Sequence, residues 1–181
     1  MSIIRKEHPF TVHALCLMTN HFHVSIETEN TNISKIMQKL LHLYASEVNN
    51  KYDYTGHVFE GRYTSCLIED ERYFLEVSRY IHLNPVKAGM VTAPQDYRYS
   101  SCGLFMPDSC VCVEKAQKDT VFKRINELVN TERTLGYFAD DRCSPGAASS
   151  REEYHKFVVG PVSHEEQELL IRKDMHDDQG T

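Results

Sequence analysis

Residues 10–27 hold two short runs on either side of a Thr-Asn pair, and this pattern constrains the fold more than any other. The first run, FTVHALCLM, is rich in β-forming residues, and the second, HFHVSIE, alternates apolar and polar positions. Alternation with a period of two around a turn-forming pair predicts a β-hairpin. In the second strand His21 and His23 point to one face, while Phe22 and Val24 point to the other.

Two amphipathic helices are expected after the hairpin. Apolar residues recur at helical spacing over residues 33–48, behind a polar stretch that can cap a helix. The second helix runs through EDERYFLEVSRYIHL, with Asp70 as its cap and Pro85 as its end. Between the two helices, residues 57–69 alternate well enough to predict another strand, with a bulge at Gly61.

The second part of the chain predicts a helical extension. Residues 119–130 and the stretch REEYHKFV have helical patterns, residues 141–150 have the composition of a linker, and SHEEQELLIRKDM offers a further short helix. We therefore expect an α+β core over residues 1–105 and a helical, acidic extension over residues 106–181.

The charge distribution limits the partners that the chain can have. Residues 1–100 hold ten Lys and Arg against eleven Asp and Glu, and residues 101–181 hold ten against fifteen. A near-neutral core argues against avid, sequence-blind duplex binding, which needs many phosphate contacts. Because the extension has the wrong charge for DNA, we expect it to be dispensable for DNA chemistry.

The sequence also bears on cellular location. No apolar run approaches the roughly 18 residues that a membrane span needs, and the start lacks the apolar region of a secretory signal. We expect a cytoplasmic protein with no membrane partner. The six cysteines are scattered, and the closest two, Cys110 and Cys112, have a CxC spacing that does not match zinc sites. Reduced thiols are the expectation.

Tyr80 and Asn84 lie one turn apart on the second predicted helix, so they share a face. Two imidazoles and an amide oxygen suit a divalent cation, Mg²⁺ or Mn²⁺, that keeps positions open for phosphate oxygens. The phenol is then a candidate nucleophile, and its attack on a phosphodiester would leave a phosphotyrosine and a free 3′-hydroxyl. Tyr73 is a rival on nearly the same face, with core packing as its alternative role.

The stretches LMTNHFHVSIE, GHVFEGRYTSCLIEDERYFLEVSRYIHLNPVKAGMV and YRYSS together resemble the single-tyrosine HUH transposases, especially the REP-associated tyrosine transposase-like group. The resemblance covers residues 10–105 and extends weakly through EEYHKFV. It implies that His21 and His23 are the HUH metal ligands, that Tyr80 is the nucleophile, and that Asn84 is the third, helix-borne ligand. It also implies single-stranded DNA beside a hairpin as substrate, cut and rejoined through a 5′-phosphotyrosine.

The resemblance further implies a ferredoxin-like antiparallel sheet with helices on one face. The family usually begins with a strand and a helix before the hairpin, whereas this chain begins almost at the hairpin. We therefore expect a sheet that is incomplete at its N-terminal side. An unfilled slot exposes strand edges, which favours a homodimer or aggregation.

Five further residues are candidates for general contacts with DNA. The candidates are cations for phosphates, a tyrosine for base stacking and a helix histidine: Arg62, Arg79, Lys87, Tyr63 and His82. Surface cations are usually only solvated, and Tyr63 can simply fill a strand face. Two rival functions stay open. One is a truncated, non-catalytic remnant that still binds hairpin DNA or nothing, and the other is a metal-dependent phosphodiester hydrolase whose histidines activate water.

Overall fold

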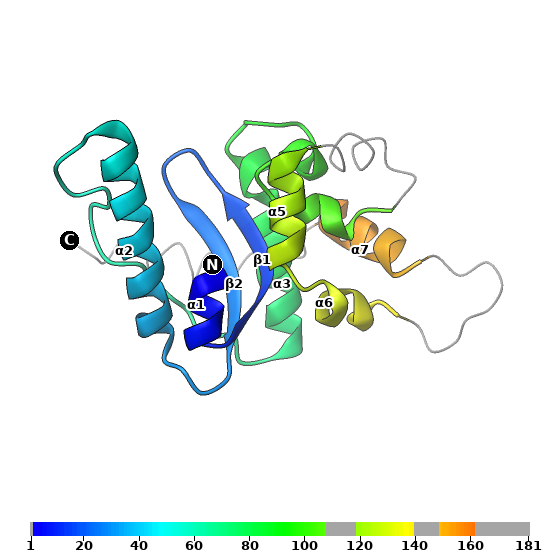
Figure 1. Ribbon diagram of the computed structural model, residues 1–181. Helices are drawn as coiled ribbons and strands as arrows, with labels where there is room; N and C mark the ends of the chain where they lie inside the picture. Colours follow the sequence, from blue (N-terminus) through cyan, green and yellow to red (C-terminus); the bar gives the residue numbers. More distant parts are fainter. Residues whose placement is uncertain (1, 108–118, 140–148, 162–181) are drawn as a thin grey trace. The chain divides into compact units, whose positions relative to one another are not determined.

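The computed structural model describes residues 2–107, 119–139 and 149–161, which form an antiparallel hairpin and a set of helices (Figure 1). The elements are α1 (Ser2–Glu7), β1 (Phe10–Leu17), β2 (Phe22–Thr28), α2 (Ile33–Tyr52), α3 (Glu71–Lys87), the 3₁₀ turns η1 (Pro94–Asp96) and η2 (Ser101–Phe105), α5 (Thr120–Leu128), α6 (Glu132–Tyr137) and α7 (Ser150–Val159). The α+β class is confirmed, and the described parts of the extension are helical as predicted.

The chain divides into two compact units. The first comprises Met1–Thr11 and Glu27–Leu67, and the second comprises Val12–Ile26 and Ile68–Thr181. The second unit thus combines the turn end of the hairpin with everything that follows residue 67. The predicted boundary between the core and the extension at residue 105 stays a prediction. The expected linker at 141–150 falls mainly outside the described residues, and so does the expected helix SHEEQELLIRKDM.

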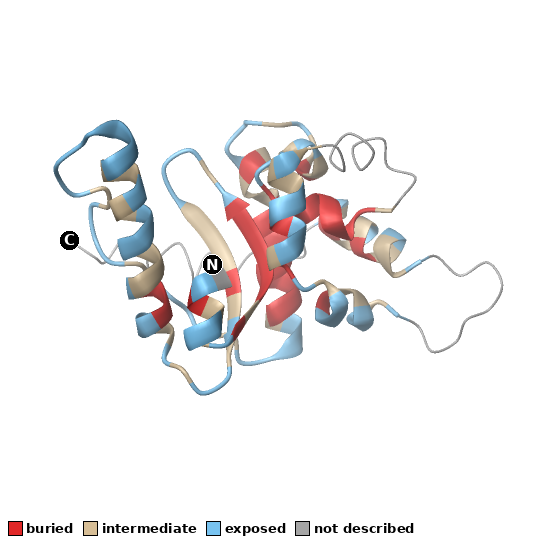
Figure 2. Ribbon diagram, viewed as in Figure 1, coloured by how far each residue is buried: buried red, intermediate tan, exposed pale blue. Residues whose placement is uncertain are grey.

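In the first unit, α2 follows the predicted pattern closely. The Asn32 side chain accepts a hydrogen bond from the Ser34 backbone N–H and caps the helix, and Asp53 ends it in the left-handed conformation with φ 49°. Ile36 and Met37 of α2 are buried, so only the first turns of the helix contribute to a core. The rest of α2 is mostly exposed (Figure 2).

The strand predicted over residues 57–69 is wrong, because this segment has no regular secondary structure. Its side chains contact α2 instead: the Phe59 ring lies 5.7 Å from the Tyr44 ring, and the Tyr63 and Ser34 hydroxyls share a hydrogen bond of 2.8 Å. A sequence that alternates apolar and polar residues forms a strand only where a neighbouring strand supplies hydrogen-bond partners for its backbone. Within the described part of the chain no strand lies beside this segment. Gly61 accordingly marks no bulge.

In the second unit, α3 begins as predicted and ends later than predicted. The Asp70 carboxylate accepts a hydrogen bond of 2.7 Å from the Tyr73 backbone N–H, which caps the helix. Pro85 does not end it, because a proline in the last turn removes only one helical N–H donor. The helix ends where Gly89 adopts a φ of 67°, and the Met90 N–H then bonds the Pro85 carbonyl at 2.9 Å.

One face of α3 packs on the hairpin to form a buried cluster. Val77, Tyr80 and Ile81 contact Ala14 and Cys16 of β1, and Figure 2 shows β1 and α3 as the most continuous buried elements. Burial of side chains of this size typically contributes about 1.5–3 kcal/mol each. The cluster therefore anchors the helix that carries the predicted nucleophile to the strand that leads into the histidine pair.

The second edge of β1 meets segments from later in the chain. The Leu17 N–H bonds the Tyr99 carbonyl at 2.9 Å, and the Asn130 N–H bonds the Val12 carbonyl at 2.8 Å. Isolated bridges pair Cys16 with Ser100 and Val12 with Val129. These contacts satisfy part of the edge that the expected incomplete sheet would leave exposed.

The opposite face of α3 carries a buried polar network. Tyr154 of α7 is 0% exposed, and its hydroxyl lies 2.7 Å from the Ser78 Oγ and 2.8 Å from the His82 Nδ1. The His82 Nε2 lies 2.8 Å from the Ser101 Oγ, which also accepts the Leu15 N–H at 3.0 Å. His82 is therefore an interior residue with partners for both ring nitrogens, and this role replaces the expected DNA contact.

Burial lowers the pKa of His82 from its ordinary value of 6.5 to about 3. The unfolded chain therefore binds a proton at His82 below pH 6.5 that the folded chain does not bind. We expect this residue to reduce the free energy of unfolding by on the order of 1 kcal/mol per pH unit between pH 6.5 and pH 3, and to contribute no pH dependence above that window.

The measurement is urea denaturation at pH 7 and pH 5. His82→Gln should show a smaller loss of stability between the two pH values than the unchanged chain, whereas His42→Gln, at an exposed position on α2, should keep the full loss. Equal losses in the unchanged chain and His82→Gln would contradict this role of His82.

Candidate active site

The histidine pair lies at the turn end of the hairpin, within the second unit. The His21 and His23 ring centroids are 4.9 Å apart, and the ring planes are perpendicular. His21 is exposed and His23 is partly buried. The two imidazoles that the spacing predicts on one face are therefore adjacent, at the distance from which two ring nitrogens can serve one ion.

Asn20 orients the first of these imidazoles. Its Oδ1 lies 2.7 Å from the His21 Nδ1, and because an amide oxygen only accepts, the Nδ1 must carry the proton. The Nε2 then presents its lone pair, which is the form that binds a metal. The sequence marked Asn20 only as a turn residue, although an amide directly before an HxH pair is a signal that sequence reasoning could have used.

Tyr80 contacts both His23 and Lys87. Its ring centroid lies 5.5 Å from that of His23, with perpendicular planes, and the Lys87 ammonium nitrogen lies 4.6 Å from the ring centroid. The Tyr80 residue is 9% exposed. The predicted nucleophile is thus held beside a predicted ligand and a cation. Tyr73, the rival nucleophile, packs against the cluster of α3 and β1, which agrees with its alternative role in the core.

Asn84 is tied to the helix turn that carries Tyr80. Its Nδ2 donates a hydrogen bond of 2.8 Å to the Tyr80 carbonyl. This bond fixes the amide and leaves the side-chain oxygen as the atom that it can offer to a cation. The predicted ligand and the predicted nucleophile are therefore coupled through one helical turn.

The residue types of the three predicted ligands, two imidazoles and an amide, suit a divalent cation such as Mg²⁺ or Mn²⁺. The His21 tautomer and the fixed Asn84 amide supply a nitrogen and an oxygen in the forms that ligate. Among the described residues, no three His, Cys, Asp or Glu side chains are grouped to hold a metal ion. The predicted ligand set of His21, His23 and Asn84 includes an amide side chain, which is not one of these four residue types. Cys110 and Cys112 lie outside the described residues.

The remaining predicted DNA contacts have different surroundings. Arg79 is buried, donates to the Gly160 carbonyl, and lies over the Phe157 ring at 5.0 Å, so it serves the interior. Arg62 is exposed and Tyr63 is partly buried, and both belong to the first unit. Of the five candidates, Lys87 contacts the predicted nucleophile.

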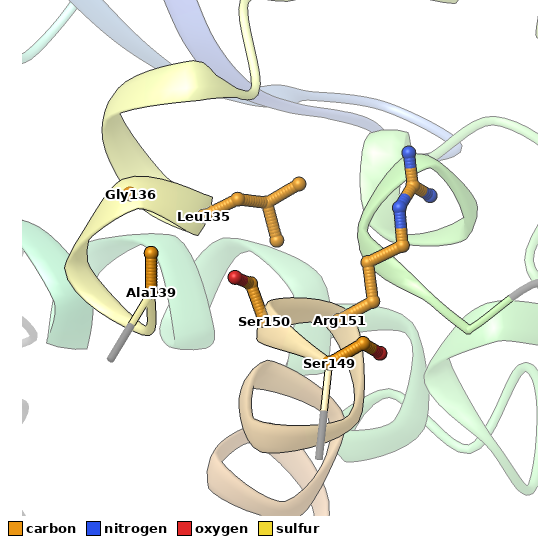
Figure 3. Close-up of a pocket in the computed structure, with 6 residues that line it drawn as sticks. All are labelled: Leu135, Gly136, Ala139, Ser149, Ser150 and Arg151. Carbon is orange, nitrogen blue, oxygen red and sulfur yellow. The ribbon is translucent and has the colours of Figure 1, made fainter. Parts of the chain in front are cut away.

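A hollow between α6 and the start of α7 contains little reactive chemistry (Figure 3). Its charged lining residue, Arg151, has its Nη1 within 2.6 Å of the Leu104 carbonyl and 3.1 Å of the Met106 carbonyl. That guanidinium is therefore engaged in holding η2. The predicted site residues His23 and Lys87 instead lie beside Tyr80.

Comparison with known families gives a match over the segment that carries this site. Residues 1–84 match the IS200-like transposases, a segment that includes both histidines, Tyr80 and Asn84. This segment is a little under half of the 181-residue chain, and the similarity to that family is a property of this segment. The family supports a transposase-like role with DNA as a partner, and it is generally metal-dependent.

The other comparisons and the helix lengths add two facts. Neither the comparison with curated proteins nor that with solved structures gives a match for this transposase-like chain. Within the described ranges, every helix is too short or too polar to cross a membrane.

The Asn20 contact generates a prediction about metal affinity. Asn20→Ala should weaken Mn²⁺ binding on the order of tenfold, because the His21 imidazole loses the partner that sets its tautomer and orientation. Calorimetric titration with Mn²⁺ measures this affinity. Asn50→Ala, at an exposed position on α2, is the matched control. Unchanged affinity in Asn20→Ala would remove Asn20 from the site.

Proposed function

We propose that this protein is a transposase that cuts and rejoins single-stranded DNA beside hairpins through a 5′-phosphotyrosine intermediate. The observation that carries the proposal is the ring contact of 5.5 Å between Tyr80 and His23. It brings the candidate nucleophile beside a residue type that binds metals, inside a segment similar to IS200-like transposases. A phenol and an imidazole pair so arranged suit phosphodiester transfer better than water activation alone.

His21, His23 and Asn84 would hold Mg²⁺ or Mn²⁺. When bound, the ion supplies positive charge that polarises the phosphodiester and offsets charge that develops in the transition state. The chain's own contribution is to prepare the ligands. Asn20 sets the His21 tautomer, and the hydrogen bond to the Tyr80 carbonyl orients the Asn84 amide.

Tyr80 would carry out the covalent step. Its Oη forms a bond to phosphorus, the bond from phosphorus to the 3′-oxygen breaks, the phenolic proton is released, and the 3′-oxygen leaves as a hydroxyl. The 5′-phosphate stays on Tyr80. Since the phosphotyrosine retains the energy of the broken ester, a second 3′-hydroxyl can attack it and rejoin the strand without ATP.

Lys87 would bind the DNA strand near the cut. Its ammonium lies next to the Tyr80 ring and is exposed, so it can approach a phosphate of the bound strand. Arg62 and Tyr63 would contact DNA from the first unit, Arg62 through phosphates and Tyr63 through base stacking. A homodimer stays part of the proposal, and light scattering measures it.

The two rival functions differ from the proposal in their products. A hydrolase that activates water leaves no protein–DNA adduct and gives Tyr80 no chemical role. A non-catalytic remnant binds DNA without cutting it. An SDS-stable adduct between the chain and a labelled hairpin oligonucleotide, formed with Mn²⁺, would exclude both.

We predict that Tyr80→Phe abolishes the adduct and the nick, because it removes only the attacking oxygen. Mn²⁺ affinity and folding should stay nearly unchanged, since the phenyl ring still packs against the cluster. Gel analysis of labelled hairpin DNA measures both products. Tyr73→Phe, on the same helix, should keep the adduct. Cutting at the normal rate by Tyr80→Phe would replace the transposase proposal with the hydrolase.

We predict that Asn84→Ala raises the Mn²⁺ concentration needed for half-maximal cutting on the order of tenfold or more, since it removes one oxygen ligand. The thermal midpoint should change little, because Asn84 lies in the last turn of α3, which ends at Lys87. Cutting rate against Mn²⁺ concentration and circular dichroism provide the two measurements. A large loss of folded protein would instead assign Asn84 a structural role.

A further inference from the structure

The two faces of α3 have separate partners. Successive residues of a helix are rotated by about 100°, so Ser78 and His82 share one face while Tyr80 and Asn84 lie on the opposite one. The face with Tyr80 packs on the hairpin, and the face with Ser78 meets α7. A rotation of α3 about its axis therefore moves both faces together.

Tyr154 is the residue of α7 that holds the face opposite Tyr80. One hydroxyl bonds both Ser78, at 2.7 Å, and the His82 Nδ1, at 2.8 Å. Phe105 and Phe138 surround the tyrosine ring, with centroids 5.0 Å and 5.6 Å away. Because the ring is fully enclosed, the hydroxyl has little freedom to follow a rotation of α3.

Arg79 adds a second connection between α3 and the end of α7. Its guanidinium lies over the Phe157 ring and donates to the Gly160 carbonyl. Arg79 points about 80° away from the middle of the Ser78 and His82 face, as expected from helix geometry. Two contacts at different angles around one axis restrict rotation more than either contact alone.

We propose that Tyr154 is a positioning residue for the DNA-cutting reaction, acting through Ser78 and His82 on the rotation of α3. The inference rests on the proposed function. A rotation of about 10° would move a phenol oxygen, lying roughly 8 Å from the helix axis, by about 1.4 Å. Displacement of a reacting group by about 1 Å can cost on the order of a hundredfold in rate.

This role makes the extension part of the catalytic apparatus. Its acidic charge led to the expectation that it is dispensable for DNA chemistry. The hydroxyl of Tyr154 instead reaches the helix of the nucleophile from a segment about seventy residues later in the chain. The extension then serves the reaction through position, and its charge is irrelevant to that task.

The test compares Tyr154→Phe with the unchanged full-length chain, using labelled hairpin oligonucleotide and Mn²⁺. The expected result is a fall on the order of tenfold or more in adduct formation per folded molecule at saturating DNA, with the DNA concentration for half-maximal rate unchanged. Circular dichroism under the same conditions gives the folded fraction. Tyr137→Phe, an exposed tyrosine on α6, is the matched control and should keep the full rate.

Ser78 supplies a second, milder pair of variants. Ser78→Ala removes one partner of the Tyr154 hydroxyl and should lower the rate in the same direction, whereas Ser78→Thr keeps a hydroxyl and should restore most of it. These variants decide the question if Tyr154→Phe fails to fold. Full rates per folded molecule in both Tyr154→Phe and Ser78→Ala would overturn the positioning role.

The same assays separate this inference from the function on which it rests. If the unchanged chain forms no adduct, or if Tyr80→Phe still forms one, the proposed function fails and the positioning role fails with it. If the unchanged chain forms an adduct that depends on Tyr80, and Tyr154→Phe matches its rate, the positioning role alone is wrong.

Discussion

The packing of α3 between the hairpin and α7 is the interaction on which the second unit depends. On one side, Tyr80 and its neighbours exclude water against Ala14 and Cys16. On the other side, the hydroxyl of Tyr154 and the imidazole of His82 satisfy each other in a fully buried position. An unsatisfied buried polar group costs about 1–3 kcal/mol, so the network tolerates few other orientations of the helix.

This packing also explains how a phenol and a pair of imidazoles come together from distant parts of the sequence. The histidines lie at the turn end of the hairpin, where His21 is exposed and His23 is partly buried. Tyr80 approaches His23 from a buried helix and is therefore held in a restricted set of positions. Under the proposed function, a restricted tyrosine beside the histidine pair leaves little reorganisation for the reaction itself.

The segment that matches a known family and the compact units of the structure have different boundaries. The match to IS200-like transposases ends at residue 84, directly at the predicted third ligand. The compact unit that contains this ligand continues through Ser101 and Tyr154, which complete the buried network of α3. The extension also meets the second edge of β1 through Asn130. Residues outside the family segment thus supply contacts that hold the family residues in place.

The sequence by itself determined the elements whose signals are local. Alternation around Thr19–Asn20 predicted the hairpin, Asp70 predicted the start of α3, and i, i+2 and i, i+4 spacing predicted which site residues share a face. Only the tertiary structure decided the rest. Residues 57–69 alternate like a strand but have no edge to join, and His82 resembles a surface contact until α7 covers it. Periodicity reports which side chains share a face, whereas the partner that covers that face comes from residues far along the chain.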